Sequence, residues 1–189
     1  MNRLARWWQV TLGDACMALR RPHAAAAHYR RARDLAPQDA RAAAAHAFAL
    51  ATVGERRAAI AAFDAALALR PAWADVHFDR GFLLQASGEH AAALGAFDAA
   101  LALDADHDRA LYGKALSLIA LGRPDEAVAP LERNTRLQPL SPYGWYQLGR
   151  LQHDRGKADK TRAIIARLAT FDPAVAAQLE RETGLGPPR

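Results

Sequence analysis

The segment FDAALAL occurs twice in this chain, at residues 63–69 and again at residues 97–103, so its two starting points lie 34 positions apart. Other residues keep the same spacing. Glycines recur at Gly54, Gly88, Gly122 and Gly156, and prolines at Pro37, Pro71, Pro139 and Pro173, with Ala105 in the missing place. A period of about 20 to 50 residues is typical of proteins built from stacked units, none of which can bury its apolar face alone.

Each period has a glycine turn near its middle and usually a proline break near its end, which leaves room for two helices of about 12 to 14 residues. In the second helix one face carries a small residue, a large ring four positions later and a small residue three positions after that. These triplets are Ala25, Tyr29 and Ala32; Ala59, Phe63 and Ala66; and Ala93, Phe97 and Ala100. The first helix has its own small position at Gly13, Ala47, Gly81, Ala115 and Gly149. Small residues let two helix backbones approach closely, so the pattern predicts paired helices.

Five such units fit the chain, at residues 6–39, 40–73, 74–107, 108–141 and 142–175. The sequence that begins at Pro173 predicts one amphipathic capping helix over about residues 173–184, followed by a flexible tail at 185–189. The 51% hydrophobic content comes mainly from Ala and Leu, with 7% aromatic residues, which favours packed helices over sheets. We therefore expect residues 1–189 to form a single all-α domain.

The motifs resemble those of the tetratricopeptide repeat (TPR) family. Residues 145–149, WYQLG, match the family's W-x-x-L-G, and Ala59, Phe63, Ala66 and Pro71 complete its A-x-x-x-F-x-x-A-x-x-x-x-P signature. The resemblance covers about nine-tenths of the chain. Departures are Asn134, Thr161 and Leu168 in place of small residues and Ala105 in place of proline. The resemblance implies a right-handed superhelical solenoid of five antiparallel helix pairs plus the C-terminal capping helix.

The same resemblance implies that a peptide or partner protein binds along a concave groove lined by the first helix of each pair. The groove positions here carry an apolar, partly aromatic set: Phe48, Phe78, Phe82, Tyr112 and Tyr146. Charged residues are expected to flank it: Asp75, Asp79, Arg41, Arg109 and Arg150. The alternative for the two tyrosines is packing against the neighbouring helix, and for Phe48 and Phe82 it is packing in the core. Some members hold the C-terminal carboxylate of heat-shock chaperones with a clamp of Lys, Asn and Arg, and this sequence has no such clamp.

The first unit has no earlier unit to cover it, so Trp7 and Trp8 either pack against the second helix or form an end contact for a partner or a second copy. The same unit holds five clustered arginines: Arg20, Arg21, Arg30, Arg31 and Arg33. Such clusters are usually solvated, and the alternative is an acidic partner, whether protein, lipid or nucleic acid. The net charge of +5 is divided into basic ends and an acidic middle, which argues against a continuous nucleic-acid-binding face.

The sequence predicts no enzyme, cofactor or metal site. The only G-x-G lies in the C-terminal tail, no G-x-S-x-G occurs, and His23 and His28 are five positions apart where a zinc-binding helix needs four. The single cysteine, Cys16, excludes an internal disulfide. The N-terminus lacks the unbroken apolar core of a signal peptide, and no apolar run is long enough to span a membrane, so we expect a cytoplasmic protein.

The leading hypothesis is therefore an adaptor that binds a peptide or protein in an apolar groove. A self-assembling oligomeric scaffold and a chaperone-like accessory protein of a secretion or envelope machine stay open as alternatives. The Arg- and Ala-rich composition is typical of a GC-rich bacterial genome.

Overall fold

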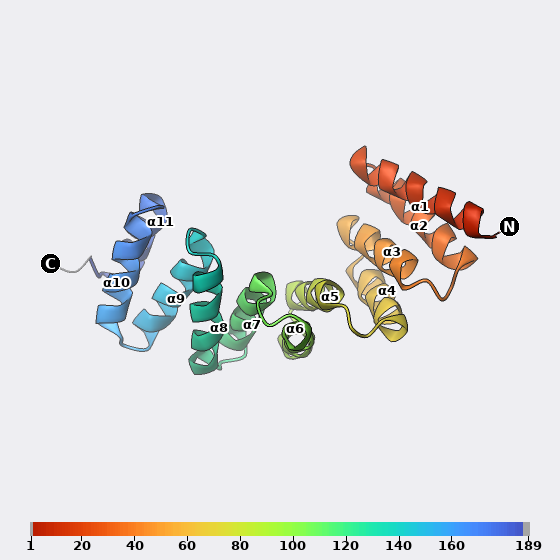
Figure 1. The fold of residues 1–189 in the computed structure, drawn as a ribbon. Coiled ribbons are helices and arrows are strands. Elements are labelled where there is room, and N and C mark those ends of the chain that lie inside the picture. Colours follow the sequence, from red (N-terminus) through yellow and green to blue (C-terminus); the bar gives the residue numbers. More distant parts are fainter. Residues whose placement is uncertain (1, 187–189) are drawn as a thin grey trace. The chain divides into compact units, whose positions relative to one another are not determined.

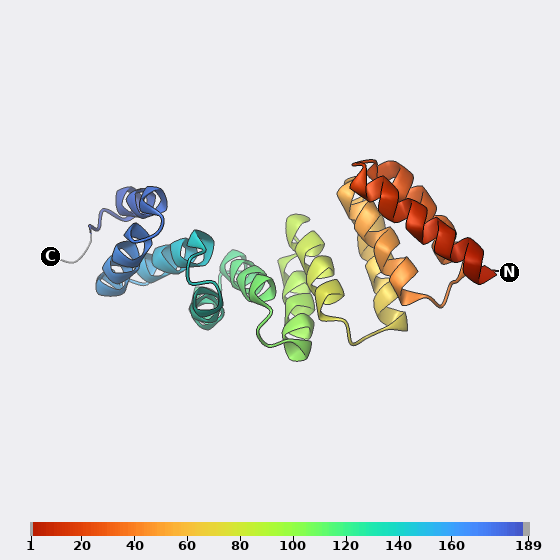
Figure 2. The same cartoon turned by 45° about the horizontal axis from the view of Figure 1, so that its top comes forward.

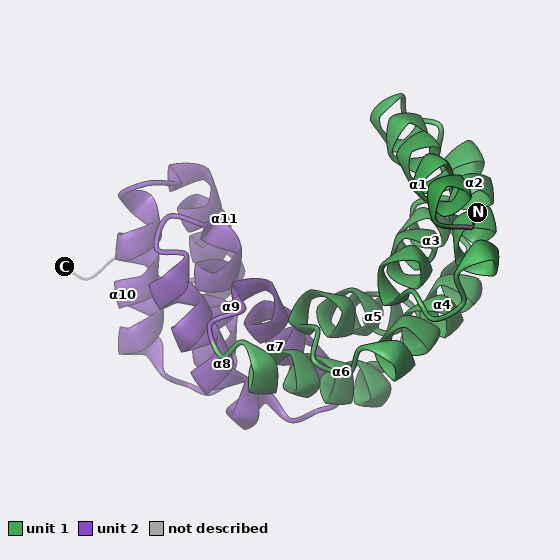
Figure 3. Cartoon of the chain, turned by 45° about the vertical axis from the view of Figure 1, so that its right-hand side comes forward, with its two compact units in different colours: residues 1–105 green, residues 106–189 purple. Residues whose placement is uncertain are grey.

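The computed structural model describes residues 2–186, which form eleven α-helices and divide into two compact units (Figure 1, Figure 3). Unit 1 (residues 1–105) contains α1 (Asn2–Ala18), α2 (Pro22–Leu35), α3 (Ala40–Thr52), α4 (Arg56–Leu69), α5 (Ala74–Ala86) and α6 (His90–Leu103). Unit 2 (residues 106–189) contains α7 (Asp108–Ala120), α8 (Pro124–Leu137), α9 (Pro142–Asp154), α10 (Ala158–Ala169) and α11 (Pro173–Thr183). The repeat pattern predicts a single domain, and the two compact units are each described here by themselves.

The helices pair in the order predicted from the repeat. In unit 1, α1 packs on α2, α3 on α4 and α5 on α6, and the red α1 and α2 run side by side in both cartoon views (Figure 1, Figure 2). In unit 2, α7 packs on α8 and α9 on α10, while α11 lies against both α9 and α10. The all-α architecture of five antiparallel helix pairs with a C-terminal capping helix is thereby confirmed.

The core of each pair in unit 1 is the small–large–small face of its second helix. Phe63 and Phe97 are almost completely buried, and the alanines on either side of them have no exposed surface. A Cβ atom placed on Gly81 would lie 2.8 Å from Cε1 of Phe97, so the glycine in the first helix is what lets the ring of the second helix fit. The predicted role of the repeated FDAALAL segment is confirmed.

The turn inside each pair explains the regular glycines. Gly54, Gly88 and Gly122 have positive φ angles of 88°, 80° and 71°, a conformation that L side chains rarely adopt. The first pair carries Arg20 at the equivalent position, 34 residues before Gly54, and Arg20 also has a positive φ, of 56°. The turn geometry is thus kept where its preferred residue is missing.

Three of the departures from the repeat pattern lie in unit 2, and the two polar ones, Asn134 and Thr161, are accommodated locally. Asn134 is buried and its side-chain amide donates to the backbone carbonyl of Asp108 at 2.9 Å. Its carboxamide also lies where a Cβ on Gly144 would stand, so the two positions fit as a pair. Thr161 is buried with its hydroxyl 3.2 Å from the backbone carbonyl of Lys157.

The predicted capping helix is α11, which begins at Pro173 and ends before Gly184. Asp172 caps its N-terminus by accepting a hydrogen bond from the backbone N–H of Val175. Of the predicted flexible tail at 185–189, residues 187–189 lie outside the described residues.

Candidate functional site

The strongest candidate for a binding surface lies in unit 1, on the first helices of the second and third pairs. Phe48 in α3 and Phe82 in α5 occupy equivalent positions 34 residues apart, and their side chains are 51% and 55% exposed. We call these two residues the Phe48/Phe82 surface. Large apolar side chains exposed at equivalent points of neighbouring repeats are the expected mark of a contact surface.

Phe78, which the sequence analysis places in the same strip, is only 8% exposed. Its ring packs between Phe82, with the ring centroids 6.3 Å apart, and Phe97 in α6, at 6.0 Å. A buried ring cannot be offered to a partner, but it can hold the neighbouring ring in place. Phe78 therefore supports Phe82 and connects it to the core of the α5–α6 pair.

The flanking charges in unit 1 come from α3 and α5. Asp75 and Asp79 both lie on α5, Asp75 exposed and Asp79 half-buried, and each is engaged in a polar interaction. Arg41 is exposed in the first turn of α3. The α5 side of the surface is consequently the acidic one.

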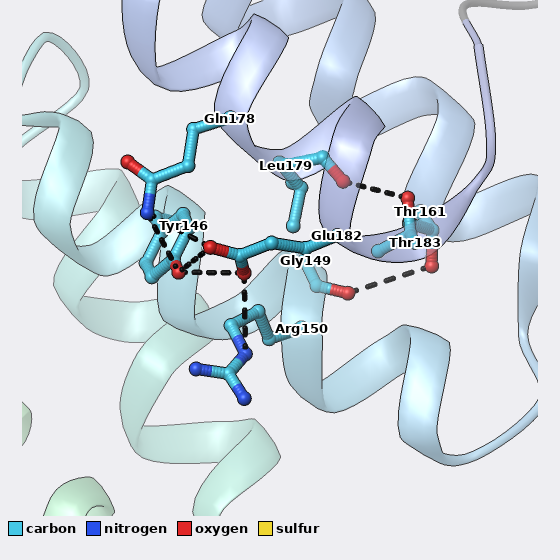
Figure 4. Close-up of polar contacts among 8 residues, drawn as sticks. All are labelled: Tyr146, Gly149, Arg150, Thr161, Gln178, Leu179, Glu182 and Thr183. Atoms are coloured by element: carbon cyan, nitrogen blue, oxygen red, sulfur yellow. Dashed lines mark hydrogen bonds and ion pairs between the residues drawn. The ribbon is translucent and has the colours of Figure 1, made fainter.

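In unit 2 the candidate residues meet the capping helix (Figure 4). The hydroxyl of Tyr146 in α9 donates to the carboxylate of Glu182 in α11, and Gln178 donates its amide to both Tyr146 and Glu182. Arg150 completes the group, with its Nε 3.7 Å from Glu182 and its guanidinium 6.0 Å from the Tyr146 ring centroid. α11 thus covers the polar edges of Tyr146 and Arg150, two of the four groove residues predicted in this unit.

This network has an electrostatic signature. The hydrogen bond to Glu182 is the main reason that the pKa of Tyr146 is raised above 10.0. Conversely, hydrogen bonds from Gln178 and then Tyr146 hold the pKa of Glu182 below its ordinary value. Both groups therefore keep the protonation states that the contact needs at neutral pH.

The other candidates in unit 2 lie on α7. Tyr112 is half-buried, and burial raises the pKa of its hydroxyl. Arg109 is exposed one residue into the helix and takes part in a polar interaction. Tyr112 is therefore partly packed and partly exposed, and its part in binding a ligand stays a prediction.

At the N-terminal end of unit 1, Trp7 and Trp8 are 54% and 56% exposed, with their rings in an edge-to-face arrangement at 5.1 Å. Neither ring is buried against the second helix, so the packing alternative is wrong for both tryptophans. Close to them lies a feature that the sequence analysis misses, an open cleft of about 860 Å³ lined by arginines. The four arginines come from α1, α3 and the end of α4, so no sequence motif brings them together: Arg3, Arg6, Arg41 and Arg70.

Among residues 2–186, no group of three or more His, Cys, Asp or Glu side chains is placed to hold a metal ion. The buried His46 lies with its Nδ1 3.4 Å from a guanidinium nitrogen of Arg33.

Comparison with known proteins identifies the repeat. A family model described as a tetratricopeptide repeat matches residues 78–142 and 112–176, which together span just over half of the chain. Comparison with curated proteins gave no match.

Many solved structures share the fold. The MamA protein is 16% identical, with a TM-score of 0.83 and 98% of each chain covered. PilF of Pseudomonas aeruginosa is 20% identical, with a TM-score of 0.79 over 96% of this chain and 85% of its own. YrrB, a TPR protein with an unusual peptide-binding site, is 22% identical, with a TM-score of 0.72 over 82% of this chain and 84% of its own. At these identities the likeness establishes the fold alone.

Proposed function

The chain belongs to the tetratricopeptide repeat family, and on this premise we propose that it is a non-enzymatic interaction module that binds a peptide segment or partner protein through the Phe48/Phe82 surface. The observation that carries the proposal is the exposure of about half of each of these two rings at equivalent repeat positions. The YrrB fold, which has a peptide-binding site of its own, supports a peptide as one form of ligand.

The mechanism follows from the packing beneath the surface. Phe82 rests on Phe78, which rests on Phe97, so the exposed ring is held by two layers of the core. A ring that is already fixed loses little conformational entropy when a partner covers it, and the burial of its apolar area then contributes to affinity. Phe82 is therefore the expected anchor point, with Phe48 as the second contact one repeat earlier.

The charges around the anchors define the partner further. Asp75 and Asp79 lie on the same helix as Phe82, and residues 38–105 carry a net charge of −3. The acids on the Phe82 side favour a basic group at that end of the partner, through steering and register more than through raw affinity, whereas Arg41 flanks the Phe48 side. The partner proposed here is a segment with apolar anchor residues and at least one Lys or Arg beside them.

A peptide library displayed on phage, selected on the immobilised full chain, tests this function. Selected peptides should carry apolar anchors with basic residues, and their affinity should fall about tenfold or more in the Phe48→Ala, Phe82→Ala double variant. Tyr143→Ala is the matched control, because Tyr143 is an exposed ring in the other unit. Selected peptides that bind the double variant as tightly as the wild type would exclude this surface as the ligand site.

A further inference from the structure

The outer side of α1 carries a continuous apolar face with no neighbour in the described part of the chain. Its large members are Leu4, Trp7, Trp8 and Leu12, each at least 40% exposed, and Leu19 follows directly after the helix. Positions 4, 7, 8 and 12 lie on one side of a helix, and the face from Leu4 to Leu19 is about 22 Å long. We call these five residues the α1 outer face.

The repeat shows what this face would contact in a regular stack. Moving Trp8 forward by one, two and four periods gives Ala42, Val76 and Gly144, all of which are buried. Val76 packs within the cluster that contains α4 residues, and Gly144 lies directly against Asn134 of α8. These positions are small because a preceding helix comes close to them. Trp8 is the large member of this series, and its side chain therefore blocks the regular approach of another repeat, including the last helix of a second copy.

Charge argues against two copies pairing through this face. α1 and the turn after it carry arginines at both ends, Arg3 and Arg6 at the start and Arg20 and Arg21 at the finish. The acid between them, Asp14, already accepts a hydrogen bond from Tyr29 at 2.6 Å. If two copies of α1 paired in parallel, the arginines at equivalent ends would face each other. If they paired antiparallel, the arginines at the start of one copy would face those at the end of the other. Both arrangements place like charges in contact.

The arginine cleft described above adjoins the first turns of α1. Of the described residues that line it, Asp39 is the only acid, and its carboxylate caps α3 and pairs with Arg6. Arg3, Arg41 and Arg70 are exposed at the cleft. Arg3 stands one helical turn before Trp7, so a basic rim borders the aromatic part of the outer face.

We infer that this end of unit 1 docks on an anionic lipid bilayer, with the α1 outer face in the interfacial layer and the arginine cleft against headgroup phosphates. Tryptophan and leucine on one side of a helix with arginines at its borders suit the boundary between acyl chains and headgroups. The bilayer yields to a protruding tryptophan, whereas a protein partner would need an apolar groove with an acidic rim shaped to it. The proposed contact is peripheral, at the depth of the headgroups. Within residues 2–186 no helix is both long and apolar enough to cross a membrane.

Vesicle binding by the full chain tests the inference. We expect co-sedimentation with vesicles of phosphatidylglycerol and phosphatidylcholine, weakening as salt rises, and little with phosphatidylcholine alone. A brominated phosphatidylglycerol should quench tryptophan fluorescence of the wild type. The Trp7→Ala, Trp8→Ala variant should lose about tenfold or more of vesicle binding, and Arg3→Gln with Arg70→Gln should lose binding to anionic vesicles specifically. The exposed Tyr143→Ala variant is the matched control.

The α1 substitutions lie on exposed positions, so circular dichroism and thermal unfolding should match the wild type. Three results would overturn the inference. The first is no binding to anionic vesicles at low salt, which would leave an acidic protein as the candidate partner. The second is binding that survives loss of both tryptophans. The third is a wild-type oligomer that the Trp7→Ala, Trp8→Ala variant converts to a monomer in light scattering, which would assign the face to a second copy.

Discussion

Tyr146 of α9 donates its hydroxyl hydrogen to Glu182 of α11, whose two carboxylate oxygens lie 2.8 and 2.7 Å from the phenol oxygen (Figure 4). The contact joins α9, the first helix of the last pair in unit 2, to the capping helix α11. Beneath it, Leu179 is fully buried and occupies the space left by the missing side chain of Gly149. The capping helix is thus held by one apolar anchor and one polar network.

Leu179→Ala should release α11. Removing a fully buried leucine costs about 2–5 kcal/mol of unfolding free energy, because a cavity replaces the lost contacts. Tyr146→Phe should cost less and act locally, raising amide hydrogen exchange over residues 173–183 while leaving unit 1 unchanged. Tyr143→Phe, at a 70% exposed ring, is the control. Equal protection of α11 in the Tyr146→Phe variant and the wild type would show that the polar network does not hold this helix.

Gly81→Ala should destabilise the α5–α6 pair. The new methyl group would stand 2.8 Å from the ring of the buried Phe97 and 3.2 Å from the Cβ of Ala96, so the helices must shift apart. Overpacking of this kind costs about 1–3 kcal/mol. Gly95→Ala is a matched control on the facing helix, since Gly95 is exposed with nothing within 4 Å of an added Cβ. The Gly95→Ala substitution should raise the free energy of unfolding by about 0.5–1 kcal/mol, because alanine has a higher helix propensity than glycine. Chemical denaturation of both variants shows whether the free energy of unfolding falls for Gly81→Ala and rises for Gly95→Ala.

Arg20→Gly should stabilise unit 1. Arg20 has a φ of 56°, and the left-handed conformation costs a residue with a side chain about 1–2 kcal/mol. Glycine removes that strain but gains freedom in the unfolded chain, so a net gain of about 0.5–1 kcal/mol is expected. Arg21→Gly is the control, because Arg21 has a φ of −112° and gains nothing from glycine. A loss of thermal stability in Arg20→Gly would contradict the account of this turn.

Stability should fall as the pH drops, with His46 as one cause. Burial, followed by the charge of Arg33 and then of Arg30, holds the pKa of His46 below 6.5, and Asp34 and Glu55 oppose this only in part. In the unfolded chain the imidazole binds its proton near pH 6.5, so the unfolded state holds more protons and gains stability below that pH. His46→Gln should flatten the decrease in unfolding free energy between about pH 7 and pH 5. The same slope in His46→Gln as in the wild type would contradict this, and the exposed His23→Gln serves as the control.

The helix pairs could be predicted from the sequence because their contacts lie within one period. The Ala59, Phe63 and Ala66 face packs on the helix immediately before it, so a 34-residue pattern records the contact directly. The glycine turns have the same local origin. The residues that recur every 34 positions are therefore the ones that form the recurring buried faces and turns.

Three features of the candidate residues are not predictable from the sequence, each for its own physical reason: the burial of one ring, the contacts of Tyr146 and the existence of the arginine cleft. Phe78 and Phe82 stand one helical turn apart, yet Phe78, against the ring of Phe97 in the next helix, is buried while Phe82 is half exposed. Tyr146 is bonded by α11, which has no counterpart in the repeat and therefore no periodic signal. The arginine cleft combines residues of α1, α3 and the end of α4, which are far apart in the sequence, so no local motif predicts it.

Photo-crosslinking tests the central claim, partner binding at the Phe48/Phe82 surface, most directly. A photoreactive benzoyl-phenylalanine placed at position 48 or 82 keeps an aromatic ring at each site, and position 143 provides an equally exposed ring in the other unit. Irradiation in living cells, followed by mass spectrometry, should give the same crosslinked partner from positions 48 and 82 and none from position 143. A partner that crosslinks from position 143 but from neither position 48 nor position 82 would contradict the claim.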